Sequence, residues 1–112
     1  MSVAFVLGNG LSRKPIPFDP LKKIGKVYAC NAVYRSHTPD YLVAVDAKMV
    51  NEICQAGAQL RMPVWTNPNR AYKKFKKLNY FEPSLGWSSG PTALWLCCSH
   101  NHQMVNLLGF DF

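Results

Sequence analysis

Five short apolar runs divide the chain and predict the strands of a sheet. They cover residues 3–7, 26–30, 41–45, 62–66 and 104–110. The first run is apolar at every position, which is typical of a central strand that is buried on both faces of a parallel sheet. The last run has a similar character over residues 105–110. We therefore expect these two runs to form central parallel strands.

A helix is predicted between the third and fourth runs, over residues 46–57. Its apolar side chains recur at the spacing of one helical face. They are Met49, Val50, Ile53 and Cys54. Asp46 has the side chain of an N-cap, and Gly57 is typical of the position that ends a helix.

A second helix is predicted before the last run, over residues 89–100, with Ser89 as its N-cap. This segment is apolar nearly all round, so we expect the helix to be buried. Between the first two runs, Pro15, Pro17 and Pro20 predict an irregular or extended backbone over residues 14–21, where a helix is absent or short.

Strands that alternate with helices predict an α/β fold, Rossmann-like, with a mainly parallel sheet of about five strands and flanking helices. With 112 residues, 48% of them hydrophobic, the chain suits a single domain over residues 1–112. Ligands bind such sheets outside the carboxyl ends of the strands. Short polar residues follow all five predicted strands, which predicts a polar cleft along that edge. They are found at residues 8–12, Asn31, Asp46, Asn67 and Asp111.

The predicted cleft has the chemistry of an anion site. Gly8 and Gly10 let main-chain N–H groups approach a ligand, while Asn9 and Ser12 supply short polar side chains. The sequence Ser-Ser-Gly at residues 88–90 begins the second helix, whose free N–H groups and dipole favour phosphate. Taken alone, the segment G-N-G-L-S is equally consistent with a plain glycine turn, because it lacks a third spaced glycine.

Four motifs, in order along the chain, resemble the nucleotide-binding core of bacterial sialyltransferases and related sialyltransferase-like proteins. They are G-N-G-L-S at 8–12, A-C-N at 29–31, S-S-G-P-T-A-L-W-L at 88–96 and L-L-G-F-D-F at 107–112. In that family the first turn and the C-N hold the cytidine nucleotide of a CMP-sugar donor, and the S-G contacts it again. The resemblance implies a nucleotide or nucleotide-sugar binding domain, similar to the donor-binding half of a sialyltransferase. From the motifs and strand ends, the candidate binding residues are Gly8, Asn9, Gly10, Ser12, Asn31, Asp46, Ser88, Ser89 and Gly90.

The resemblance supplies no catalytic base. Leu11 stands where the family usually has Pro, and Asp46 stands where comparable enzymes carry Asn. A carboxylate at this position can accept hydrogen bonds from ribose hydroxyls, but it repels a phosphate. The family's catalytic His and phosphate-binding tyrosines follow the segment that resembles G-F-D-F, and His37, His100 and His102 are predicted to lie away from the strand ends. We expect weak nucleotide binding, with slow or no turnover of CMP-sugar, and we name no catalytic residue.

The net charge of +7 favours anionic partners. Part of the excess lies in residues 70–77, R-A-Y-K-K-F-K-K, where aromatic and basic residues interleave as in many nucleic-acid contact surfaces. An alternative function is therefore a small basic adaptor that binds nucleic acid or a protein partner through residues 70–77. The simpler interpretation, which we favour, is a solvated loop or helix face whose Tyr72 and Phe75 pack inward.

The cysteines predict reduced core thiols, because all four lie in apolar segments without the C-x-x-C spacing of a metal or redox site. On one helix Cys97 and Cys98 would point about 100° apart, and His100 and His102 about 200° apart. We therefore expect no metal and no cofactor. No apolar stretch approaches the ~20 residues of a membrane span, and we expect a cytoplasmic protein without membrane insertion. Apolar surface on the last strand hints at a homo-oligomer.

Overall fold

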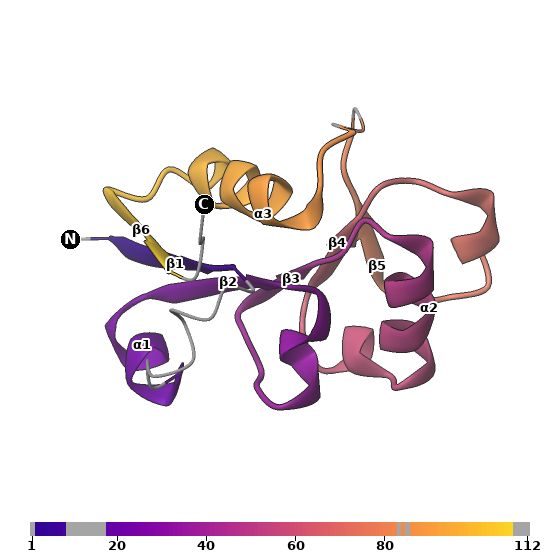
Figure 1. Ribbon diagram of the computed structural model, residues 1–112, viewed down its shortest axis with the longest axis horizontal. Coiled ribbons are helices and arrows are strands. Elements are labelled where there is room, and N and C mark those ends of the chain that lie inside the picture. The colour runs from indigo at the N-terminus through magenta and orange to yellow at the C-terminus, as the bar shows by residue number, and fades with distance from the viewer. Residues whose placement is uncertain (1, 9–17, 83, 85, 109–112) are drawn as a thin grey trace.

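The computed structural model describes residues 2–8, 18–82, 84 and 86–108, and in them six parallel strands form one sheet (Figure 1). The strands lie in the order β5-β4-β3-β2-β1-β6. They are β1 (Val3–Leu7), β2 (Lys26–Cys30), β3 (Tyr41–Val43), β4 (Val64–Thr66), β5 (Leu78–Tyr80) and β6 (Met104–Leu108). The α-helices are α1 (Phe18–Ile24), α2 (Ala47–Gln55) and α3 (Ser89–Ser99), and the 3-10 turns are η2 (Asn31–Arg35), η3 (Ala58–Leu60) and η4 (Arg70–Tyr72). The predicted α/β, Rossmann-like fold class is confirmed.

Helices cover both faces of the sheet, and each face has its own core. Helix α3 lies on one face, while α1 and α2 lie on the other (Figure 1). Because side chains alternate along a strand, Ala4 and Val6 of β1 face the α3 side, and Phe5 and Leu7 face the opposite side. None of these four side chains is more than 9% exposed. β1 is thus the buried central strand that its continuous apolar run predicts.

The prediction for the last run is wrong in one respect, because β6 is an edge strand within the part of the chain that the structure describes. It pairs with β1 alone there. Helix α3 packs over β1, β2 and β3, so β6 is less covered on that face. Met104 and Leu107 are each 46% exposed. Near-continuous apolar sequence therefore marks a strand without showing that both of its sides are paired. Self-association through this exposed surface stays a prediction.

The helix predictions need two corrections. Helix α1 begins at Phe18, inside the segment expected to be irregular, because Pro20 lies in its first turn, where no intrahelical N–H partner is needed. It is short, as expected. The N-cap of α3 is Ser88, one residue earlier than predicted. Asp46 is the N-cap of α2, although its side chain makes no capping hydrogen bond. Strand β5 was not predicted, because Leu-Asn-Tyr is too short to show a pattern.

The two histidines after α3 meet at a buried tyrosine, which the helical projection did not predict. Helix α3 ends at Ser99, and Asn101 adopts a left-handed backbone with φ of 60°. This turn brings His100 Nδ1 within 2.5 Å, and His102 Nε2 within 2.8 Å, of the hydroxyl of Tyr28. The other ring nitrogen of His102 lies 2.9 Å from Ser2 Oγ, just before β1.

This Ser2–His102–Tyr28–His100 chain has two arrangements of protons that satisfy every contact with neutral rings. The Tyr28 hydroxyl has a single proton, so one ring accepts it and the other ring donates to the phenol oxygen. Desolvation raises the pKa of Tyr28, and the nearby Cys97, Tyr41 and Asp40 add to the rise. Desolvation also lowers the pKa of His100, and the neighbouring His102 acts in the same direction. The folded state therefore favours the neutral form of both groups.

We predict that the free energy of unfolding falls as the pH drops below about 6.5, the ordinary histidine pKa of the unfolded chain. The lowered pKa of His100 means that the unfolded chain binds the proton first, so the stability present above pH 6.5 is lost below it. Urea unfolding of His100→Gln should show a flatter dependence between pH 7 and 5. His37→Gln is the matched control, since His37 packs on Phe18 outside this cluster. An equal flattening in both variants would contradict the prediction.

Candidate functional site

The parallel sheet brings the predicted polar positions to one edge. Gly8 follows β1, Asn31 follows β2, Asp46 lies just beyond β3 and Asn67 follows β4. Strands β2 to β5 lie on one side of β1, and β6 lies on the other. The chain therefore changes direction at β1, and Gly8 stands at this switch point, where ligands bind in open α/β sheets.

The ends of β1 and β2 are held together by their own hydrogen bonds. The Gly8 N–H donates to the carbonyl of Leu108 at 2.7 Å, and the Cys30 thiol donates to the carbonyl of Leu7 at 3.7 Å. Asn31 has a left-handed backbone with φ of 55°, which is uncommon outside glycine. Asn31 is half-buried and directly follows Cys30, the last residue of β2. Asn9, Gly10 and Ser12, the other predicted members of this turn, lie outside the described residues.

Helix α3 begins at the carboxyl end of β3. The hydroxyl of Ser89 accepts a hydrogen bond from the Val45 N–H at 3.1 Å, and Ser89 is only 5% exposed. This bond puts the N-terminus of α3 beside the residue that precedes Asp46. Ser88 is exposed, and Gly90 is half-buried. Of the predicted site residues, Asp46, Ser88, Ser89 and Gly90 are thus brought together.

A second link fixes the 3-10 turn that begins at Asn31 against the helix that begins after Asp46. Arg35 Nε donates to Glu52 Oε2 at 2.8 Å, and Arg35 also forms an ion pair with the other carboxylate oxygen. Tyr34 donates to the same carboxylate. The hydrogen bonds from Arg35 and then Tyr34 hold the pKa of Glu52 at about 2. Turn η2 and helix α2 therefore keep a fixed relative position.

Two buried polar atoms lack partners at the end of β4, among the residues that the structure describes. They are Thr66 Oγ1 and Asn67 Oδ1. Thr66 is fully buried. Leaving a buried polar atom without a hydrogen bond costs about 1–3 kcal/mol, so such atoms are uncommon away from functional sites. Asn67 is among the predicted strand-end residues but not among the predicted binding residues. Thr66 was not predicted to belong to the site, and its only signal in the sequence is that a polar residue closes an apolar run.

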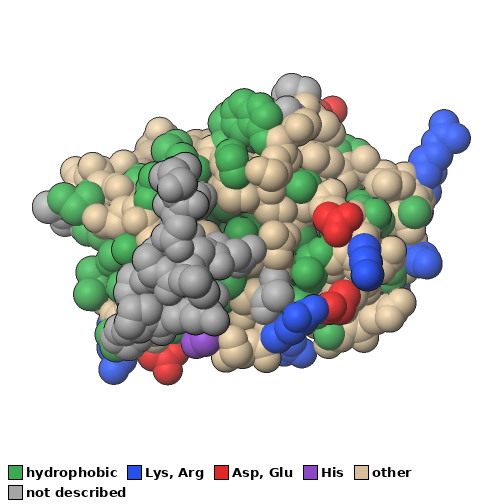
Figure 2. Space-filling view, in the orientation of Figure 1, with side chains coloured by type: hydrophobic (Ala, Val, Ile, Leu, Met, Phe, Trp, Pro, Cys, Tyr) green, Lys and Arg blue, Asp and Glu red, His purple; other side chains and the backbone are tan. Residues whose placement is uncertain are grey.

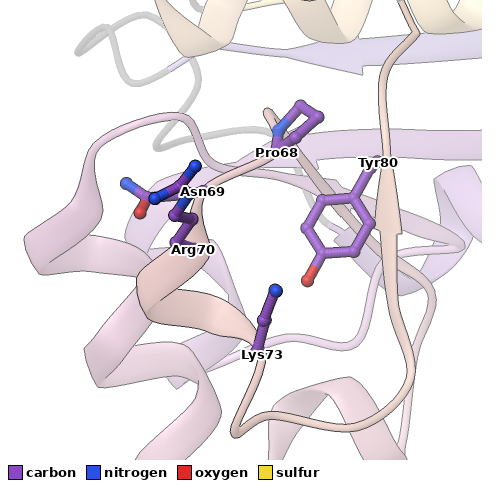
Figure 3. A pocket seen from close by; sticks show the side chains of 5 residues that line it. All are labelled: Pro68, Asn69, Arg70, Lys73 and Tyr80. Carbon is purple, nitrogen blue, oxygen red and sulfur yellow. The ribbon is translucent and has the colours of Figure 1, made fainter.

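A cavity of about 350 Å³ lies next along this edge. It is lined by Pro68, Asn69, Arg70, Lys73 and Tyr80. Figure 3 shows the Lys73 ammonium and the Tyr80 hydroxyl pointing into the same hollow, with Asn69 and Arg70 on its other side. Asn69 Oδ1 accepts a hydrogen bond from the Ala71 N–H at 2.9 Å, which holds the turn that carries Arg70. The basic stretch was singled out in the sequence, but its contribution to a pocket was not.

Tyr72 connects this cavity to the cleft at Asp46. Its side chain is only 2% exposed and belongs to the core on the α2 side. Desolvation raises the pKa of Tyr72, the Asp46 carboxylate raises it further, and the side chain of Asn69 acts in the opposite direction. The phenol is therefore within electrostatic reach of both Asp46 and a residue that lines the cavity.

Positive charge is concentrated at this end of the sheet. On the face shown in Figure 2, most of the visible Lys and Arg side chains lie over the half of the molecule that holds α2 and the loop before β5. That loop contributes Arg70, Lys73, Lys74, Lys76 and Lys77, all exposed. The carboxyl edge thus combines a helix N-terminus, a carboxylate at Asp46 and the cations Arg70 and Lys73.

No family model, curated protein or solved structure matches this chain. The described residues include no cluster of three or more His, Cys, Asp or Glu side chains suited to a metal ion. Within the same residues, no helix is both long and apolar enough to cross a membrane. We therefore infer function from the geometry of the carboxyl edge.

We predict that Ser89→Ala lowers the free energy of unfolding by about 1–3 kcal/mol, because it leaves the Val45 N–H without its buried acceptor. Urea denaturation of both proteins measures the difference. Ser88→Ala is the matched control, since Ser88 is exposed and its side chain makes no capping bond. Equal stability of the two variants would show that the Ser89 hydroxyl does not fasten α3 to β3.

Proposed function

We propose that this chain binds a nucleotide or nucleotide sugar along the carboxyl edge of its sheet. The observation that carries the proposal is the bond from the Val45 N–H to Ser89, which fixes a helix N-terminus beside Asp46. A helix N-terminus favours a phosphate through its free N–H groups and its dipole. The unpartnered polar atoms at Thr66 and Asn67 support a ligand at the same edge.

The residues at this edge suit different parts of a nucleotide. Gly8, at the switch point, allows a ligand to approach the backbone closely. Asn31 offers an amide that both donates and accepts hydrogen bonds, as recognition of a base edge requires. The Asp46 carboxylate can accept hydrogen bonds from ribose hydroxyls, and the N–H groups of Ser89 and Gly90 can donate hydrogen bonds to a phosphate. The proposal therefore assigns the sugar to the Asp46 side of the cleft and the phosphate to the start of α3.

We propose a domain similar to the donor-binding half of a sialyltransferase. This domain binds the nucleotide but transfers the sugar slowly or not at all. Sugar transfer needs a base for the acceptor hydroxyl. Among the described histidines, His100 and His102 contact Tyr28 and the start of β1, and His37 packs on Phe18. Asp46 is the acidic side chain at the cleft, and a carboxylate acts as a base near neutral pH only if its pKa is raised.

Contact with nucleic acid or a protein through residues 70–77 is the second candidate. Its support is the set of exposed lysines in that loop. The aromatic residues weigh against base stacking, because Tyr72 is buried and Phe75 packs against the core, which confirms the inward packing predicted from the sequence. Base stacking on aromatic rings supplies much of the affinity for single strands, so this surface favours a weaker, purely electrostatic contact.

We predict that CMP or CDP raises the melting temperature of the chain, because a ligand of the folded state stabilises it. Asp46→Ala should weaken this binding by about 5- to 100-fold, the equivalent of one buried or charge-assisted hydrogen bond. Asp19→Ala is the matched control, since Asp19 is an exposed carboxylate on α1. No stabilisation by any nucleotide, together with stabilisation by single-stranded RNA, would favour the second candidate.

We also predict slow or no release of CMP from CMP-sialic acid by the purified protein, with or without a sugar acceptor. The physical reason is that the described residues at the cleft include no evident base for the acceptor hydroxyl. Chromatographic quantification of CMP over time measures the rate. Turnover that is well above the uncatalysed background, and that Asp46→Asn abolishes, would show that Asp46 acts as the base and would contradict the prediction.

A further inference from the structure

We propose that the cavity lined by Arg70, Lys73 and Tyr80 is a subsite for a phosphate group of a small-molecule ligand. The identity of that ligand as a nucleotide rests on the proposed function, whereas the affinity of the cavity for phosphate does not. The cavity lies at the same sheet edge as the cleft, because Tyr80 ends β5 and stands opposite Thr66 in the strand register. Pro68, its first lining residue, follows Asn67 directly.

The donors in this cavity are those that a phosphate requires. Arg70 presents a planar fork of N–H groups, Lys73 a compact ammonium and Tyr80 a hydroxyl. Figure 3 shows the Lys73 ammonium and the Tyr80 hydroxyl pointing toward one another across the hollow, where one anion can meet both. Charge-assisted hydrogen bonds of this kind are the strong ones in anion recognition.

Among the described residues, no acidic side chain lines the cavity. Within the described part of the chain, one ion pair joins a Lys or Arg to a carboxylate. It is formed by Arg35 of η2 and Glu52 of α2. The positive charge of Arg70 and Lys73 is therefore not neutralised by a salt bridge to another described residue. Concave surfaces lined by one sign of charge concentrate the opposite sign. An anion is the ligand that this lining favours.

The neighbouring lysines do not share this arrangement. Lys74 lies over the ring of Phe75, with its Nζ 5.2 Å from the ring centre. Lys77 lines a different hollow, together with Arg61 and Pro63, at the amino ends of β4 and β5. Arg70 and Lys73 thus line the carboxyl-edge cavity, whereas Lys74 and Lys77 lie elsewhere. This division distinguishes a discrete phosphate subsite from a uniformly basic nucleic-acid surface.

Titration of the whole chain with inorganic phosphate, followed by backbone amide chemical shifts, tests the subsite. We expect saturable shifts at residues 69–73 and Tyr80. The variant Arg70→Gln/Lys73→Met should bind at least about 10-fold more weakly. The variant Lys74→Met/Lys76→Met is the matched control, because it removes the same net charge from the same loop outside the cavity. It should stay within about 2-fold of the original chain. Equal losses in both variants, or shifts that do not saturate, would overturn the proposal in favour of diffuse attraction.

A second titration compares CDP with CMP and separates this inference from the proposed function, which assigns one phosphate to the start of α3. If the second phosphate of CDP occupies the cavity, Arg70→Gln/Lys73→Met weakens CDP binding by about 10-fold and leaves CMP within about 2-fold. Equal affinity of CDP for the original chain and this variant overturns the subsite for nucleotides while the proposed function stands. If neither CDP nor CMP binds, the proposed function fails, and the phosphate titration still decides whether the cavity is an anion site.

Discussion

The parallel pairing of β1 is the constraint on which the rest of the structure depends. β1 is buried on both faces and pairs with β2 on one side and β6 on the other. Parallel neighbours require a crossover connection for every strand, so helices and turns must cover both faces of the sheet. The same constraint puts all carboxyl ends at one edge. The fold thereby gathers residues that are as far apart in the sequence as Gly8 and Gly90 along one edge of the sheet.

The two ends of the sheet differ in how most of their polar groups are satisfied, although Gln59 Oε1, near the amino ends of β4 and β5, also lacks a partner among the described residues. At the amino end, the Tyr28 hydroxyl meets two histidines, and Asp40 accepts the Val27 N–H at 2.8 Å. At the carboxyl end, Thr66 and Asn67 keep buried oxygens without a partner among the described residues. The first arrangement stabilises the fold from within the chain. The second is typical of a functional site, where local rules are broken and the cost is met elsewhere.

The sequence predicted most of the sheet because β1, β2 and the start of β6 are continuous apolar runs with clear ends. It did not predict β5, because three residues are too few to show a hydrophobic periodicity. It also did not predict the edge position of β6, because periodicity does not show which strands pair with one another. The meeting of His100 and His102 at Tyr28 depends on the left-handed turn at Asn101, which a helical projection cannot include. At the candidate site, strand-end polarity pointed to Asn31 and Asp46, and the Ser-Ser-Gly helix start pointed to the beginning of α3. The cavity was not predicted, because the turn at residues 70–72 determines which basic side chains line it.

Asp46 and the cation-lined cavity together limit which ligand fits this edge. A carboxylate repels a phosphate, whereas Arg70 and Lys73 attract one. A simple anion would gain from the cavity but gain nothing from Asp46. A neutral sugar would gain from Asp46 but leave the cations unpaired. The combination favours a molecule that carries hydroxyls at one end and phosphate at the other, which is the chemical character of a nucleotide or a nucleotide sugar.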